Sequence, residues 1–151
     1  RFFSNRGTSG IDGCTSTAVG AAFATGKPTT LITGDVAFCY DVNAFWNNHL
    51  SPEWKVIVIA NLRGNIFRYI EGPDRAPDLL PWFESPHGRD IPAMVKSFGL
   101  PCYSANDEAS LIVGLKDLYK PHHTPAVLHI TTDALTSPKV LRDYFTKLRS
   151  S

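Results

Sequence analysis

The chain has 151 residues, of which 43% are hydrophobic and 19% are charged, and its 15 Lys and Arg nearly balance its 14 Asp and Glu. A net charge of +1 gives no electrostatic footprint for nucleic acid, and the apolar fraction is too high for a disordered chain. No apolar run approaches the roughly 20 residues that cross a bilayer, and three cysteines without CxxC spacing indicate reduced thiols and a cytoplasmic location.

The chain opens on Arg1 rather than Met, and residues 1–7 resemble the end of a buried strand that runs into a loop. A start in the middle of an element is typical of a piece cut from a longer polypeptide. The basic head and apolar run of a signal peptide are not found in this opening. We therefore expect residues 1–151 to be one domain of a larger protein.

Further along the chain, small residues predict a first helix, and β-branched apolar runs predict strands between later helices. In chain order, the expected elements are helix 11–25, strand 29–33, helix 41–50, strand 55–60, helix 91–98, helix 106–119, strand 126–131 and helix 137–148. Residues 71–90 are rich in Pro, Gly and charge, and we expect them to form a long functional loop. This alternation predicts an α/β fold, a three-layer αβα sandwich with a mainly parallel sheet.

Polar residues follow two of the expected strands. The run 29–33 leads into Gly34-Asp35, and the run 55–60 leads into Asn61. A right-handed crossover of one helix and one strand would bring these two strand ends side by side. A carboxylate and an amide oxygen suit a hard cation such as Mg²⁺, although Gly34-Asp35 as a turn and Asn61 as a cap is the alternative.

The segment 4–13, SNRGTSGIDG, resembles the signature of the 2-succinyl-5-enolpyruvyl-6-hydroxy-3-cyclohexene-1-carboxylate synthases, the MenD family. The similarity extends from residue 3 to about residue 105, and it includes the segments 16–20, 26–29, 34–35, 40–43, 64–67 and 85–88. The pair of Asp35 and a later Asn61 is shared more broadly, by thiamine-diphosphate enzymes in general.

This resemblance implies a thiamine-diphosphate-binding fold and a cytoplasmic enzyme of menaquinone biosynthesis that uses Mg²⁺ or Mn²⁺. Such an enzyme decarboxylates 2-oxoglutarate and adds the succinyl-semialdehyde carbanion to isochorismate. The family's polypeptide has three domains, and this chain resembles the C-terminal one. A glutamate of another subunit's N-terminal domain activates the cofactor, so we expect a homodimer or homotetramer and no turnover from this piece alone.

The resemblance also assigns roles to individual residues. Asp35, Asn61 and the backbone carbonyl of Arg63 would bind the metal, although the family often has Gly at position 63, where a positive φ would be costly for Arg. Arg6 would pair with a substrate carboxylate, and Ile66 and Phe67 would line the reaction pocket. The residues that would bind thiamine diphosphate are Ser9, Gly10, Ile11, Gly34, Asp35, Asn61 and Ile66. For His87 we expect only a part in ordering the loop.

Two other functions are compatible with the same residues. The chain could belong to another thiamine-diphosphate lyase or decarboxylase, of the acetolactate-synthase type, because the Asp35 and Asn61 pair does not separate these enzymes. It could also be a non-catalytic phosphate-binding module that shares the sheet.

Overall fold

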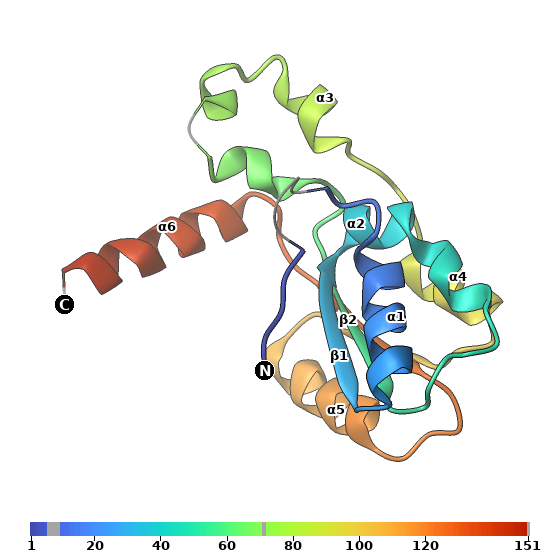
Figure 1. The fold of residues 1–151 in the computed structure, drawn as a ribbon. Coiled ribbons are helices and arrows are strands. Elements are labelled where there is room, and N and C mark those ends of the chain that lie inside the picture. The colour runs from blue at the N-terminus through green and yellow to red at the C-terminus, as the bar shows by residue number, and fades with distance from the viewer. Residues whose placement is uncertain (6–9, 71, 151) are drawn as a thin grey trace.

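The structure, a computed structural model, describes residues 1–5, 10–70 and 72–150. Over these residues it contains a four-stranded, all-parallel sheet in the order β1-β2-β4-β3 (Figure 1). The strands are β1 (Thr29–Gly34), β2 (Trp54–Ala60), β3 (Cys102–Ala105) and β4 (Ala126–Thr131). The nearly continuous apolar runs form the two central strands, β2 and β4, because central strands of a parallel sheet are covered on both faces.

Helices connect the strands. The α-helices are α1 (Cys14–Thr25), α2 (Asp35–Tyr40), α3 (Leu80–Glu84), α4 (Ile91–Ser97), α5 (Glu108–Tyr119) and α6 (Thr136–Arg149), and the 3₁₀ helices are η1 (Val42–Trp46), η2 (Asn65–Arg68) and η3 (Pro73–Arg75). Local signals fix several ends: helix α1 stops at Gly26, whose φ is 61°, and α5 starts with a capping box between Asp107 and Ser110.

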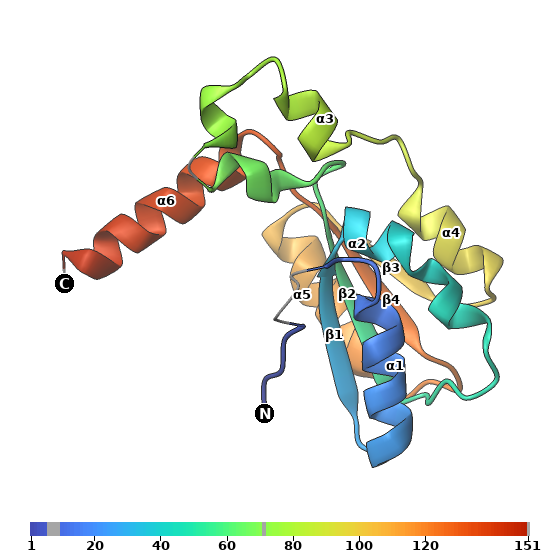
Figure 2. The same ribbon diagram turned by 45° about the horizontal axis from the view of Figure 1, so that its top comes forward.

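The two faces of the sheet carry separate hydrophobic clusters. Val56 and Val58 of β2 point to the face that α1, α2 and α4 cover, whereas Ile57 and Ile59 point to the face that α5 covers (Figure 2). Helix α5 lies close to β4, since a Cβ at Gly114 would come within 2.7 Å of the Leu128 side chain. The sheet is therefore flanked by helices on both faces, as the sequence predicts.

The second face is only partly covered. Helix α5 packs on β3 and β4, and Ile32 of the edge strand β1 is 66% exposed. Helix α6 extends away from the sheet in both ribbon views, with apolar side chains such as Tyr144 and Phe145 in solvent (Figures 1 and 2). None of the described helices has the length and hydropathy that crossing a bilayer requires.

The structure confirms the three expected strands and corrects other parts of the prediction. Phe2 and Phe3 are 102% and 89% exposed and residues 1–5 form no strand, so the prediction of a buried strand at the start is wrong. A strand needs a neighbour to satisfy its backbone, and none of the described strands pairs with these residues. Two further differences are that β3 was not expected, and that the expected helix 41–50 contains only the 3₁₀ helix η1, while α2 ends before it.

Candidate functional site

Asp35 and Asn61 lie side by side at the carboxyl edge of the sheet. Strands β1 and β2 are parallel neighbours with Gly34 opposite Ile59, so the residues that follow them emerge at the same edge. The backbone N–H of Asn61 donates a hydrogen bond of 3.0 Å to Oδ2 of Asp35. The convergence predicted from the two strand ends is thus confirmed.

The carboxylate of Asp35 is buried and held by backbone donors. Its side chain is 2% exposed. Oδ2 accepts the N–H groups of Asn61 and Leu62, the latter at 2.6 Å, and Oδ1 accepts the N–H of Val36 at 2.9 Å. Among the described residues, no lysine or arginine forms an ion pair with it, and the nearest basic group is the His87 imidazole, whose Nε2 is 3.4 Å from Oδ2.

Asn61 shapes the turn that follows β2. Its Oδ1 accepts the N–H of Arg63 at 3.1 Å, which is an Asx turn. The left-handed residue of this turn is Leu62, with φ 63°, and Arg63 does not have a positive φ. The expected difficulty of placing Arg at position 63 therefore does not arise at that residue.

The side chains at this edge carry oxygens of the type that bind hard cations. Asp35 Oδ1 accepts a single hydrogen bond, and Asn61 Oδ1 accepts one from the Arg63 N–H. The space beside Gly34 is open, since a Cβ there would meet nothing within 4 Å. Within residues 1–5, 10–70 and 72–150, no group of three or more His, Cys, Asp and Glu is placed to hold a metal.

The charge of Asp35 acts on its surroundings. Burial raises the pKa of the Cys39 thiol, and the Asp35 carboxylate raises it further, whereas Arg89 acts in the opposite direction. Burial lowers the pKa of His129, and the carboxylates of Asp35 and Asp90 oppose that effect.

A second buried carboxylate, Glu84 at the end of α3, is missing from the sequence prediction. Its side chain is 2% exposed and pairs with two arginines, Arg68 through a fork of two N–H groups and Arg63 at 3.4 Å. The Glu84 carbonyl also accepts the N–H of Gly64 at 2.6 Å. This cluster fixes α3 to the segment that follows the strand tip.

The residues predicted to line the reaction pocket lie on η2. Ile66 is 53% exposed, and Phe67 packs against Phe83 with ring centroids 5.4 Å apart. Near the start of α1, Ile11 is 43% exposed and follows Gly10. Arg6 and Ser9 lie outside the described residues, so their predicted roles stay predictions.

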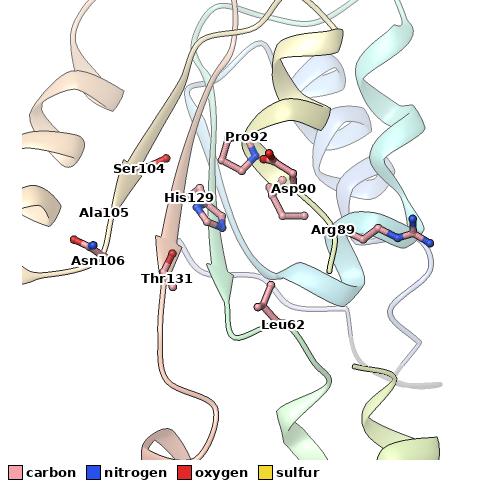
Figure 3. Close-up of a pocket in the computed structure, with 10 residues that line it drawn as sticks. Leu62, Arg89, Asp90, Pro92, Ser104, Ala105, Asn106, His129 and Thr131 are labelled. Carbon is pink, nitrogen blue, oxygen red and sulfur yellow. The ribbon is translucent and has the colours of Figure 1, made fainter. Parts of the chain in front are cut away.

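A pocket of about 380 Å³ lies at the carboxyl ends of β3 and β4, which supply part of its lining (Figure 3). Leu62, whose N–H donates to Asp35, borders it, and His129 and Asp90 face it, while the Arg89 side chain extends away from His129. Neither Asp35 nor Asn61 lines this pocket. It was not anticipated from the sequence, because its walls come from four separate segments between residues 62 and 131.

Comparison with known proteins finds no family model that matches the chain. Curated relatives do match, each called 2-succinyl-5-enolpyruvyl-6-hydroxy-3-cyclohexene-1-carboxylate synthase. The chain is 41% identical to that of Flavobacterium johnsoniae over 97% of its own length and 26% of the relative. It is 36% identical to that of Christiangramia forsetii over 99% of its length and 26% of the relative, and 37% identical to that of Cytophaga hutchinsonii over 99% and 27%. The chain spans about a quarter of the length of these relatives.

Proposed function

The chain is a portion, about a quarter, of an enzyme of the 2-succinyl-5-enolpyruvyl-6-hydroxy-3-cyclohexene-1-carboxylate synthase (MenD) family, and from this premise we propose that it is the C-terminal domain that holds thiamine diphosphate and Mg²⁺. In this proposal, the whole enzyme is cytoplasmic and serves menaquinone biosynthesis. It decarboxylates 2-oxoglutarate and joins the product to isochorismate.

One observation carries the proposal: the buried Asp35 carboxylate beside Asn61 at two neighbouring strand tips. No lysine or arginine of the described residues forms an ion pair with it, and a buried charge of this kind is stabilised by a bound cation. In the proposed site, Asp35 Oδ1, Asn61 Oδ1 and the Arg63 carbonyl bind Mg²⁺ or Mn²⁺. The diphosphate of the cofactor supplies the anion that the protein lacks at this edge.

The remaining residues of the proposed site would bind and orient the cofactor and exclude water from it. Thiamine diphosphate, when bound, supplies the carbon centre at which 2-oxo acids are cleaved. Ser9, Gly10 and Ile11 precede α1 and would contact the cofactor, and the open space at Gly34 leaves room for it. Ile66 and Phe67 would keep the reaction centre dry.

The substrates and the rest of the enzyme complete the proposal. Arg6 would pair with a carboxylate of 2-oxoglutarate or isochorismate, since a guanidinium fork matches a carboxylate. The other domains of the polypeptide and a second subunit, in a homodimer or homotetramer, would supply the acid that activates the cofactor. The piece by itself would then have no turnover.

The experiment is calorimetry on the full-length polypeptide with thiamine diphosphate, with and without Mg²⁺, followed by assays with 2-oxoglutarate and isochorismate. We expect Mg²⁺-dependent binding and product formation that needs both substrates. Binding that ignores the metal would favour the non-catalytic phosphate-binding module. Metal-dependent binding with turnover of pyruvate alone would favour an acetolactate-synthase type of enzyme.

The variant Arg6→Ala tests the substrate assignment within the same enzyme. We expect weaker apparent affinity for the two carboxylate-rich substrates with unchanged cofactor binding. Unchanged affinity for both substrates would contradict the role given to Arg6.

A further inference from the structure

The imidazole of His87 lies against the carboxylate of Asp35. Its side chain is 13% exposed, and its Nε2 is 3.4 Å from Asp35 Oδ2. Nδ1 accepts a hydrogen bond of 3.2 Å from the N–H of Arg89. A ring nitrogen that accepts carries no proton, so the neutral ring holds its proton on Nε2, the atom that faces Asp35.

Two backbone hydrogen bonds also connect the segment of His87 to Leu62 and Leu62 to Asp35. The N–H of His87 donates to the Leu62 carbonyl at 3.0 Å, and the N–H of Leu62 donates to Asp35 Oδ2. His87 Nε2 is buried and has no hydrogen-bond partner among the described residues. A buried donor without an acceptor is unfavourable by about 1–3 kcal/mol, and a shift of about half an ångström would bring Nε2 within normal hydrogen-bond distance of Oδ2.

The two oxygens of Asp35 therefore have different surroundings. Oδ2 has two backbone donors and faces a third donor on His87, whereas Oδ1 has the single N–H of Val36. Rotation of the carboxylate would exchange the two oxygens, and each donor on Oδ2 opposes that rotation. The less occupied oxygen, Oδ1, is thereby held ready for another ligand.

We propose that His87 is a positioning residue that fixes the Asp35 carboxylate through Nε2–H, so that Oδ1 is presented to a divalent cation. The inference rests on the proposed function, since it concerns the same metal site. In this inference, the loop that follows α3 contributes to the metal site through the His87 side chain. Partners of this kind, which orient a metal ligand, typically change metal affinity about 10–100-fold when they are removed.

The test compares two variants of the full-length polypeptide in calorimetry with Mg²⁺ at saturating thiamine diphosphate. His87→Leu keeps the volume and removes the donor, whereas His87→Gln keeps an N–H at a similar distance along the side chain. We expect the apparent Kd for Mg²⁺ to rise about tenfold in His87→Leu and to return to within about threefold in His87→Gln. At saturating Mg²⁺, the KM for 2-oxoglutarate should be unchanged, and His123→Leu, an exposed histidine, is the control.

The outcomes separate this inference from the proposed function. If the wild type does not bind Mg²⁺, the proposed function fails. If it binds and both His87 variants bind equally well, only the role of His87 is overturned.

If His87→Leu does not fold, ¹⁵N-histidine NMR of the wild type decides the question. A proton on Nε2 whose resonance moves when Mg²⁺ and thiamine diphosphate are added supports the inference. A proton on Nδ1, or no change on addition, overturns it.

Discussion

Two buried carboxylates about a third of the chain apart, Asp35 at the tip of β1 and Glu84 at the end of α3, are stabilised in opposite ways. Glu84 faces two arginine side chains, so its cluster carries a surplus positive charge. Asp35 is equally buried but is held by backbone N–H groups, with the His87 imidazole 3.4 Å from Oδ2. Its negative charge remains.

The difference indicates which carboxylate is structural. A buried charge with its own counter-charges needs nothing more, and it joins the segments that supply them. A buried charge that is stabilised by dipoles alone attracts a cation from outside the fold. The two residues are equally buried, and the type of donor separates them: arginine side chains at Glu84 and backbone N–H groups at Asp35.

The largest effect is expected for Asp35→Asn in the full-length polypeptide. Removing the unmatched charge should weaken Mg²⁺ binding, measured by calorimetry at saturating thiamine diphosphate, by more than about 100-fold. The fold should survive, because an amide oxygen still accepts from Asn61 and Leu62. Asp78→Asn removes the same charge from an exposed site and is the control; equal Mg²⁺ affinity in both variants would contradict the assignment.

Glu84→Gln should give the reverse pattern. The two arginines lose their counter-charge, and since they are 27% and 29% exposed, the destabilisation should be about 2 kcal/mol, below the 3–5 kcal/mol typical of fully buried pairs. We expect a lower midpoint of thermal unfolding and a Kd for Mg²⁺ within about threefold of the wild type. The exposed Glu53→Gln serves as control, and a large loss of Mg²⁺ affinity in Glu84→Gln alone would erase the contrast between the two carboxylates.

Asn61→Ala should lower both the stability of the fold and the affinity for Mg²⁺, each by a smaller amount. The Arg63 N–H loses its acceptor, a loss of about 1 kcal/mol, and the site loses one neutral oxygen. Mg²⁺ affinity should fall about tenfold by calorimetry, less than in Asp35→Asn, because no charge is removed. A larger effect than that of Asp35→Asn would reverse the proposed order of the two ligands.

The smallest effect is on the thiol of Cys39, which reports the charge of Asp35. Because that charge raises the pKa of Cys39, Asp35→Asn should lower the pKa, increase the thiolate fraction at pH 8 and speed alkylation about twofold. Burial raises the pKa of Cys102 to about 11, with Asp90 rather than Asp35 adding to it, so its slow alkylation should not change. Mass spectrometry of iodoacetamide-treated protein follows both thiols, and an equal change at Cys39 in Glu84→Gln would mean that the effect is not specific to Asp35.

The sequence was most informative at the sheet. Uninterrupted β-branched runs identify β1, β2 and β4, and parallel strands place their carboxyl ends together, so the meeting of Asp35 and Asn61 could be predicted. Strand β3 has four residues of mixed polarity, too few to give a pattern.

The sequence did not predict which side chains pair across irregular segments. Glu84 lies 16 and 21 residues from its two arginines, and no periodicity links them. The motif around His87 predicted an ordered loop but not that the ring would face Asp35. Such contacts depend on how a loop folds back, which neighbouring residues in the sequence do not determine.

The left-handed backbone at Leu62 has a consequence for engineering. A leucine in that conformation is strained by about 1–2 kcal/mol, and glycine would relieve the strain. A screen for heat resistance alone would therefore favour Leu62→Gly. That variant would strip away the side chain at the border of the neighbouring pocket and loosen the turn whose N–H holds Asp35, so thermostability would be gained at the expense of the site.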